Sequence, residues 1–136
     1  MTLFYLNINV KNNRLSWVRA GHDPAILYDP ANDAFEDLHG TGVALGVQAD
    51  ARFEANEKND LLKNQIIFLG TDGIWEARNP QGDMFGKDKI HDIIRQNHKS
   101  GANEILTICF NTLSQFLGGR APEDDVTMIV IKIIDD

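Results

Sequence analysis

The order of the apolar patterns along the chain is the feature that most constrains its fold. Short strand-like segments come first, two helical patterns follow, and one apolar strand ends the sequence. Alternating or continuous apolar runs indicate strands, whereas apolar residues spaced three and four apart indicate helices. Strands followed by helices favour an α+β domain with largely antiparallel sheets. The sequence predicts strands at 3–10, 15–20, 25–28, 34–38, 52–57, 65–69 and 126–134, and helices at 87–98 and 102–117.

Local signals support the element boundaries. Residues 3–10 alternate between apolar and other side chains, and the polar residues 11–14 form a turn into the next strand of a hairpin. Ser100 is the expected N-cap of the second helix. Gly118, followed by another glycine, suits a left-handed cap at the end of that helix.

Length and charge limit the classes of function. A chain of 136 residues is expected to form a single domain, residues 1–136, with a usable core. Its net charge of −7 argues against a nucleic-acid or anionic-membrane partner, which most of the surface would repel. A multivalent cation is a more natural companion, although many proteins are acidic only for solubility.

Cysteine content and the apolar runs bear on the compartment. The single cysteine, Cys109, cannot form an internal disulfide, and it falls on the apolar stripe of a predicted helix, where we expect a buried, inert thiol. The first residues lack a basic region before an apolar stretch, and no apolar run is long enough to cross a bilayer. The sequence therefore predicts a soluble, cytoplasmic domain.

Two aspartates stand at the ends of apolar strands. Asp72 directly follows the predicted strand 65–69, and Asp124 directly precedes the last strand. If those strands are antiparallel neighbours, the end of one lies beside the start of the other, so both carboxylates meet at one sheet edge. Two hard oxygen ligands there would suit Mg²⁺ or Mn²⁺. The alternative is that both are ordinary solvated acids at strand ends.

Other candidate groups have simple structural explanations. The glycine-spaced loop 40–46 matches neither known phosphate-binding fingerprint and is interpreted as a connection. His22 could be a base or a ligand, but a turn histidine bonded to backbone is favoured. Trp75 either packs in the core or flanks a cleft. Arg78, just before the turn sequence 79–82, either meets an anionic substrate or is solvated.

Four motifs, in this order, resemble one protein family. They are Ala20-Gly21-His22-Asp23-Pro24, Ala44-Leu45-Gly46-Val47, Thr71-Asp72-Gly73 with Glu76-Ala77-Arg78-Asn79 and Phe85-Gly86, and Asp124-Asp125-Val126-Thr127. Together they resemble the bacterial SpoIIE/RsbU-type branch of the metal-dependent, protein phosphatase 2C-like serine/threonine phosphatases (the PPM type). The resemblance implies two packed antiparallel sheets flanked by helices, an α-β-β-α sandwich.

The resemblance also implies a chemistry. Two Mg²⁺ or Mn²⁺ ions activate a water that hydrolyses phosphoserine or phosphothreonine, so no side chain serves as a covalent nucleophile. By resemblance, Asp72 and Asp124 are metal ligands. Gly73, Asp125 and Arg78 are expected beside those ligands or at the substrate. Many relatives have asparagine where this chain has Asp125.

The resemblance further implies an incomplete domain. The family's other ligands, an Asp followed by Gly on an earlier strand, would precede the first strand of this chain. We therefore expect a C-terminal portion of the catalytic domain without the N-terminal strands. It would be weakly active or inactive alone, because two carboxylates hold two divalent ions poorly. An uncovered sheet edge predicts self-association as a homodimer.

Partners follow by analogy with the family. The expected substrate is a phosphorylated regulatory protein, such as an anti-sigma-factor antagonist, within sigma factor regulation and signal transduction. Upstream sensor domains are expected in the parent protein. The alternative is a non-catalytic interaction or dimerisation module.

Overall fold

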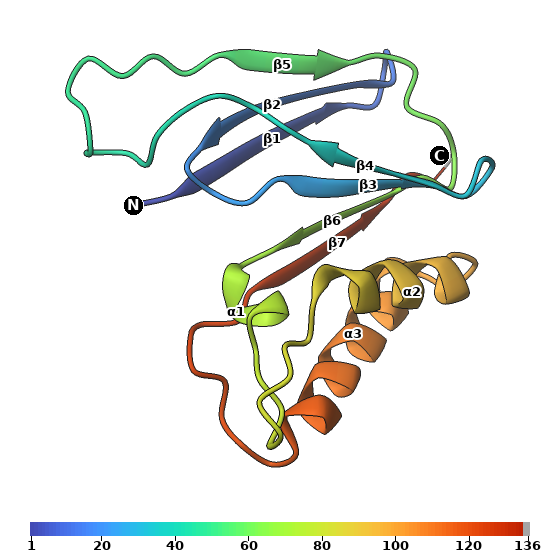
Figure 1. The fold of residues 1–136 in the computed structure, drawn as a ribbon. Helices are drawn as coiled ribbons and strands as arrows, with labels where there is room; N and C mark the ends of the chain where they lie inside the picture. The colour runs from blue at the N-terminus through green and yellow to red at the C-terminus, as the bar shows by residue number, and fades with distance from the viewer. Residues whose placement is uncertain (135–136) are drawn as a thin grey trace.

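The computed structural model describes residues 1–134 and arranges their strands in two sheets, with the helices gathered on one side (Figure 1). One sheet has the strand order β1-β2-β5, the other has the order β4-β3-β6-β7, and neighbouring strands are antiparallel. The strands are β1 (Leu3–Asn9), β2 (Arg14–Ala20), β3 (Ala25–Asp29), β4 (Ala34–Leu38), β5 (Ala55–Lys58), β6 (Ile66–Gly70) and β7 (Met128–Lys132); the helices are α1 (Asp72–Trp75), α2 (Lys87–Asn97) and α3 (Ala102–Leu117).

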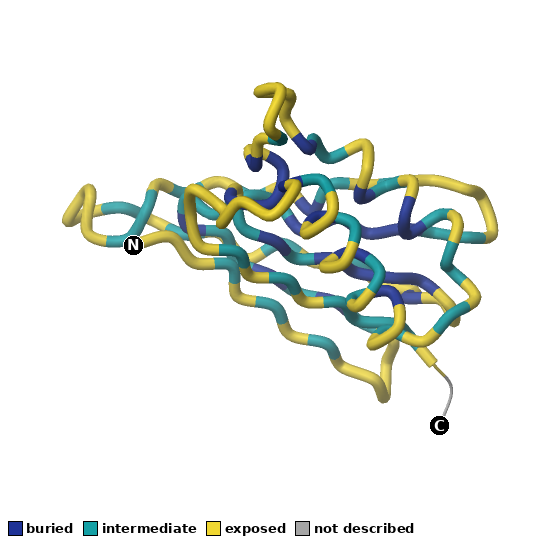
Figure 2. The backbone as a smooth tube through the Cα atoms, turned by 90° about the horizontal axis from the view of Figure 1, so that it is seen from below, coloured by how far each residue is buried: buried dark blue, intermediate teal, exposed yellow. Residues whose placement is uncertain are grey.

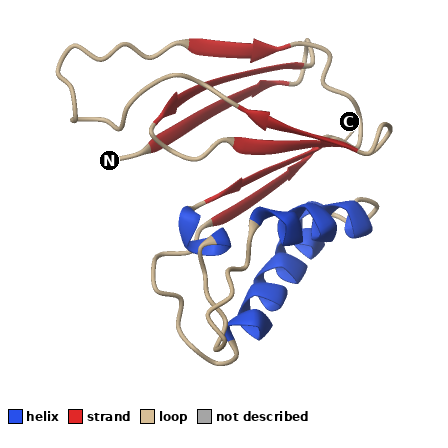
Figure 3. Ribbon diagram, viewed as in Figure 1, coloured by secondary structure: helices blue, strands red, loops and turns tan. Residues whose placement is uncertain are grey.

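The four-stranded sheet is the middle layer. Its one face packs on the three-stranded sheet and its other face is covered by α2 and α3, as the secondary-structure colours make clear (Figure 3). The predicted fold class, two largely antiparallel sheets packed with helices, is therefore confirmed. Within residues 1–134, both long helices lie on the same outer face.

Strand alternation divides the apolar side chains of β6 between two cores. Ile66 and Phe68 face the helices, whereas Ile67 and Leu69 face the other sheet, because successive side chains point to opposite faces. Nearly all of β3 and β6 is buried, and the dark blue segments of Figure 2 run through the middle of the molecule. A strand covered on both faces is continuously apolar, which is why the sequence signal at 65–69 is so strong.

The differences from the predicted elements have local causes. The four residues of α1 were not predicted, because so short a helix has no periodic stripe. The strand predicted from residue 52 starts only at Ala55. Val10 is 72% exposed because β1 ends before it. Gly101 rather than Ser100 occupies the N-cap of α3, with no side-chain hydrogen bond.

Several single-residue expectations hold. Gly118 adopts the left-handed conformation, with φ of 60°, at the C-cap of α3. Of the two alternatives left open for Trp75, the structure shows the first, because its side chain packs in the core on the helix side of the sheet. Cys109 is buried there too, and burial raises the pKa of its thiol to about 11, so the reactive thiolate is scarce. None of the helices in residues 1–134 combines the length and apolar character needed to cross a bilayer.

Helix α1 turns the chain sharply beside the start of β7. Gly73, its second residue, is buried, and a Cβ added to it would lie 2.5 Å from the carbonyl oxygen of Asp125 and 3.2 Å from that of Asp124. Both obstacles are backbone atoms, which cannot rotate away as a side chain would. A side chain at this position would therefore force the two segments apart.

An aromatic stack joins α2 to the four-stranded sheet. The ring of His91 lies 4.2 Å from that of Phe35, centroid to centroid, and Phe35 stacks in turn on Tyr28 at 4.5 Å. The Nε2 atom of His91 is buried and has no hydrogen-bond partner among the described residues. Burial lowers the pKa of His91, and the nearby carboxylates of Asp37 and Asp88 oppose this only in part.

We predict that Gly73→Ala lowers the free energy of unfolding by about 1–3 kcal/mol, the usual cost of inserting a methyl group into a packed contact. Gly101→Ala is the control, because a Cβ there meets nothing within 4 Å, and its cost should stay below about 1 kcal/mol. Urea denaturation of both variants measures the difference. Equal stabilities would contradict the packing described for Gly73.

We also predict that His91 makes stability depend on pH. Its pKa is lower in the folded chain than the ordinary value of 6.5, so the unfolded chain takes up the proton first as pH falls. The stability due to neutral His91 is therefore present above pH 6.5 and lost as pH falls toward the folded pKa. Urea denaturation from pH 7.5 to 5.5 should show this decline, and His91→Gln should reduce it.

The exposed His39 provides the control for that experiment, because His39→Gln should leave the decline in place. If His91→Gln kept the same pH dependence as the parent chain, the assignment of this effect to the stacked imidazole would be wrong.

Candidate metal centre

The antiparallel pairing of β6 and β7 brings the two predicted ligand segments together. Gly70 at the end of β6 pairs with Met128 at the start of β7. Beyond this pair, the hydroxyl of Thr71 donates to the carbonyl of Asp125 at 2.9 Å and accepts from the amide of Thr127 at 3.0 Å. These bonds extend the strand pairing into both loops, so residues more than fifty positions apart share one end of the sheet.

Asp72 and Asp124 have the same local geometry. One carboxylate oxygen of Asp72 accepts the amide of Gly73 at 3.0 Å, and one of Asp124 accepts the amide of Asp125 at 2.7 Å. Both aspartates are exposed, and neither forms an ion pair with another residue of the described chain. Each carboxylate is thus oriented by a backbone amide, and within residues 1–134 no cationic side chain pairs with it.

Two hollows flank this end of the sheet. Asp124 lines one of about 460 Å³ together with Gly73, Glu76 and Arg78. Asp72 lines a smaller hollow of about 70 Å³, which residues of the turn around His22 also line. The two carboxylates therefore line two separate hollows at the same end of the sheet, and residues of α1 line both.

The Gly21-His22-Asp23 turn reaches the same place from β2. It lines the small hollow with Thr71 and Asp72. The ring Nδ1 of His22 lies 2.9 Å from the carbonyl oxygen of Asp23, so this histidine is bonded to backbone, as expected for a turn residue. Asp23 pairs with Lys87 of α2 at 3.4 Å.

The glycine-spaced loop packs against that turn. A Cβ on Gly21, whose φ is 71°, would lie 2.8 Å from the Cα of Ala44. The amide of Leu45 donates to the carbonyl of Met1 at 2.8 Å. All four motifs named in the sequence analysis therefore converge at one end of the sandwich, although the chain separates them widely.

Arg78 is held by the turn that follows it. Its guanidinium donates to the carbonyl of Gly82 at 2.7 Å, and the amide of Gly82 donates to the carbonyl of Asn79 at 2.9 Å, which confirms the predicted β-turn. The side chain is exposed and lines the larger hollow. Arg78 is thus a cation beside an otherwise acidic space.

Three acidic residues that line the site were not among the site residues predicted from the sequence. Glu76 and Glu123 line the hollow with Asp124, and Asp23 lines the hollow with Asp72. Glu76 lies four residues after Asp72, a helical spacing that would have flagged it had α1 been predicted. Within residues 1–134, no three His, Cys, Asp or Glu side chains lie close enough together to form a complete metal site.

The alignments with curated relatives cover nearly all of this chain but only part of each relative's length. Phosphoserine phosphatase RsbU of Bacillus subtilis is 28% identical over 132 residues, which are 97% of this chain and 38% of RsbU. Protein IcfG of Synechocystis is 31% identical over 133 residues, which are 96% of this chain and 20% of IcfG. The chain thus spans well under half the length of these relatives.

Solved structures share the fold. The SiaA-PP2C domain of Pseudomonas aeruginosa superposes with a TM-score of 0.82 at 20% identity, over 97% of this chain and 51% of that one. The phosphatase domain of SpoIIE from Bacillus subtilis, presoaked with Mn, gives 0.67 at 17% identity, over 99% and 57%. The sequence matches the profile described as Stage II sporulation protein E (SpoIIE) over residues 1–134. With its motifs assembled at one end of a PP2C-like sandwich, this chain belongs to the SpoIIE family.

Proposed function

We propose that this chain carries part of the catalytic site of a metal-dependent phosphoserine/phosphothreonine phosphatase. The observation that carries the proposal is the meeting of the Asp72 and Asp124 segments through Thr71, at the end of the sheet where all four motifs converge. The names of the relatives support it, because RsbU and RsbP of Bacillus subtilis are both called phosphoserine phosphatases.

Asp72 and Asp124 would supply oxygen ligands to Mg²⁺ or Mn²⁺. Their chemistry fits, because carboxylates are the ligands that such hard cations prefer, and both are exposed without a competing cation among the described side chains. When bound, divalent ions lower the pKa of a coordinated water and offset the charge of a phosphoryl group. One solved relative of the same fold was presoaked with Mn, which agrees with this choice of cofactor.

The neighbouring residues would position these ligands. Gly73 lets α1 approach the backbone of Asp125, and the carbonyl of Asp125 accepts the Thr71 hydroxyl. The backbone of Asp125 would therefore hold its loop against α1. Arg78, which has further N–H groups beyond the one that it donates to Gly82 and lines the larger hollow, would meet the phosphate of a substrate there.

Two carboxylates are few for a pair of divalent ions. A complete centre would need further oxygen ligands in addition to Asp72 and Asp124, since such ions require several anionic donors. The solved SiaA-PP2C chain is about twice as long as the part that this chain matches. The proposal therefore treats residues 1–136 as the C-terminal portion of a catalytic domain and assigns the remaining ligands to an earlier segment of the parent protein.

The proposed substrate is a phosphorylated regulatory protein. The resemblance to the RsbU-type branch makes an antagonist of an anti-sigma factor the first choice, with sensor domains upstream in the parent protein. A protein substrate suits the site, because the Asp124 hollow is open and polar and has no apolar cleft for a small organic ligand.

The alternative is a non-catalytic interaction module. The observation favouring it is that no three His, Cys, Asp or Glu side chains within residues 1–134 lie close enough together to hold a metal ion. Under this alternative, Asp72 and Asp124 bind no metal ion, even in a longer polypeptide that contains the earlier strands of a PP2C-like domain.

We predict that the chain alone shows little or no Mn²⁺-dependent hydrolysis of p-nitrophenyl phosphate. A longer polypeptide with the preceding part of the parent domain should be active, because it adds ligands. Robust turnover by the 136-residue chain would refute the idea of an incomplete centre. Inactivity of both would favour the non-catalytic alternative.

We predict that Asp72→Asn and Asp124→Asn each weaken Mn²⁺ binding by the longer polypeptide at least about 10-fold and abolish its activity, since each removes an anionic ligand. Isothermal titration calorimetry measures the binding independently of turnover. Asp50→Asn, in an exposed loop, is the control and should change neither property. If Mn²⁺ binding survived both substitutions, the ligand assignment would be wrong.

A further inference from the structure

A short hairpin, residues 76–85, follows α1 and borders the candidate metal centre. Its two arms are joined by backbone hydrogen bonds. The amide of Phe85 donates to the carbonyl of Ala77 at 2.8 Å, and nearer the tip the amide of Asn79 donates to the carbonyl of Asp83 at 3.0 Å. The 76–85 hairpin is thus an ordered element, although it is too short to count among the strands of either sheet.

The side chain of Asn79 fixes the tip of this hairpin. Its Oδ1 atom accepts the amides of Gln81 and Asp83, at 3.0 and 2.8 Å. Its Nδ2 atom donates to the carboxylate of Asp83 at 3.0 Å. Because both ends of one amide group are bonded within the hairpin, Asn79 determines how the two arms are joined.

Helix α3 supports the hairpin from outside. The hairpin extends from α1 to the C-terminal end of α3 (Figure 1), where a Cβ added to Gly118 would lie only 2.9 Å from the ring of Pro80. At the base of the hairpin, the rings of Phe85 and Phe116 meet edge to face, with their centroids 5.2 Å apart. The 76–85 hairpin is therefore a fixed wall of the molecule.

Alternate side chains of the hairpin meet different surroundings. Ala77 and Phe85 are buried in the core on the helix side of the sheet. The hairpin side chains that line the larger hollow, together with Asp124, are Glu76, Arg78 and Met84. Met84 is 46% exposed and brings a large apolar side chain to a hollow that charged residues otherwise dominate. If Asp124 is a metal ligand, a substrate must enter this hollow and meet these side chains.

Arg78 and Met84 lie directly opposite each other on the two arms. The Cβ atoms of such a cross-strand pair are about 4.5–5.5 Å apart. A guanidinium binds phosphate oxygens, whereas the flexible thioether of methionine adapts to apolar groups of different shapes. Successive residues of an extended peptide are about 3.3 Å apart, so a phosphate and an apolar side chain about one or two residues apart would match this pair.

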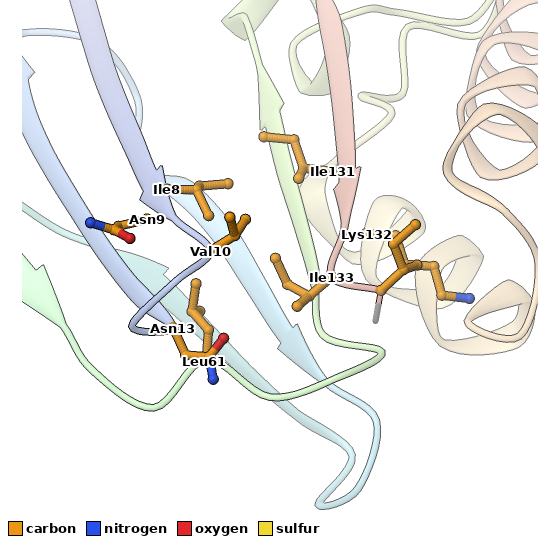
Figure 4. A pocket seen from close by; sticks show the side chains of 9 residues that line it. Ile8, Asn9, Val10, Asn13, Leu61, Ile131, Lys132 and Ile133 are labelled. Atoms are coloured by element: carbon orange, nitrogen blue, oxygen red, sulfur yellow. The ribbon is translucent and has the colours of Figure 1, made fainter. Parts of the chain in front are cut away.

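The hollow between the two sheets is a different kind of space. Figure 4 shows Ile8 and Val10 on one side of it and Ile131 and Ile133 on the other. It lies toward the end of β7, whereas Asp124 precedes the start of that strand, and neither candidate metal ligand lines it. The hollow of the hairpin is therefore the one that combines a candidate ligand with a cation and an apolar side chain.

We propose that the 76–85 hairpin recognises phosphoserine segments in which an apolar side chain lies about one or two residues from the phosphoserine. Arg78 binds the phosphate and Met84 contacts the apolar side chain. Asn79 is a positioning residue, because it fixes the tip that joins their two arms. This inference rests on the proposed function, since it requires that a phosphoserine is bound at the Asp124 hollow.

Met84→Ala tests the recognition of the apolar side chain. The assay uses the longer polypeptide, Mn²⁺ and two synthetic phosphoserine peptides, one with leucine and the other with glycine on both sides of the phosphoserine. The unchanged polypeptide should have the lower KM for the leucine peptide. Met84→Ala should raise that KM at least about 5-fold and the KM for the glycine peptide less than about 2-fold, because the lost contact is apolar. The effect should fall on KM rather than kcat, since the contact is the same before and during the reaction.

Two further variants are the controls for Met84→Ala. Met84→Leu keeps an apolar side chain of similar size and should retain the preference for the leucine peptide. Leu62→Ala removes a side chain that is 52% exposed and precedes β6, at the other end of that strand from Asp72, and it should change neither KM.

Asn79→Ala tests the positioning of the hairpin. In the 136-residue chain, it should speed hydrogen exchange at the amides of Gln81 and Asp83 at least about 5-fold, because their acceptor is lost. The amide of Phe85, bonded to Ala77, should stay protected. In the longer polypeptide, the KM for both peptides should rise. Asn79→Asp keeps an accepting oxygen and should restore most of both properties.

The possible outcomes separate this inference from the proposed function. If the longer polypeptide showed no Mn²⁺-dependent hydrolysis, the proposed function would be wrong and this inference with it. If it is active but Met84→Ala changes the two KM values equally, or changes neither, recognition by Met84 is wrong while the metal centre stands. An increase in KM on Asn79→Ala, with the amides of Gln81 and Asp83 exchanging as before, would contradict the role given to Asn79.

Discussion

The pairing of β6 with β7 is the interaction on which the candidate site depends. These strands come from opposite sides of the helical segment in sequence, yet their register sets Gly70 beside Met128 and so places the loops that follow and precede them at one end of the sheet. A shift of the register by one residue would also exchange the two faces of β7, moving its isoleucines from the inter-sheet core to the helix side. The two cores thus fix the register, and the register fixes the distance between the acidic loops.

The sequence predicted this architecture well because the continuous apolar runs of its strands and the apolar stripes of its helices are both clear. The runs before Asp72 and after Asp124 are both apolar at successive positions, as expected for strands that lie between two packed layers, and β6 is almost entirely buried. The stripes of α2 and α3 were equally clear, because each helix buries one face on the sheet. Short α1 was not predictable from periodicity, and its existence explains why Glu76 reaches the same hollow as Asp124.

Other features of the site depend on contacts that no sequence pattern records. The approach of Ala44 to Gly21 and of Asp125 to Gly73 depends on how loops from different sheets fold over one another. Lys87 lies 3.4 Å from Asp23 and 4.5 Å from the ring centre of Trp75, and nothing in the spacing of these residues indicates that they meet. The motifs could be recognised individually, but their arrangement required the fold.

Thr71 gives this arrangement a chemical constraint of its own. Its hydroxyl is a donor to one residue of the second acidic loop and an acceptor from another, so both capacities of a single oxygen are in use at once. Valine would have the same shape but neither capacity, and of the side chains this small only serine retains both. The geometry of two distant loops is therefore tied to one rotatable O–H group, in a residue that would itself carry no charge and bind no ion.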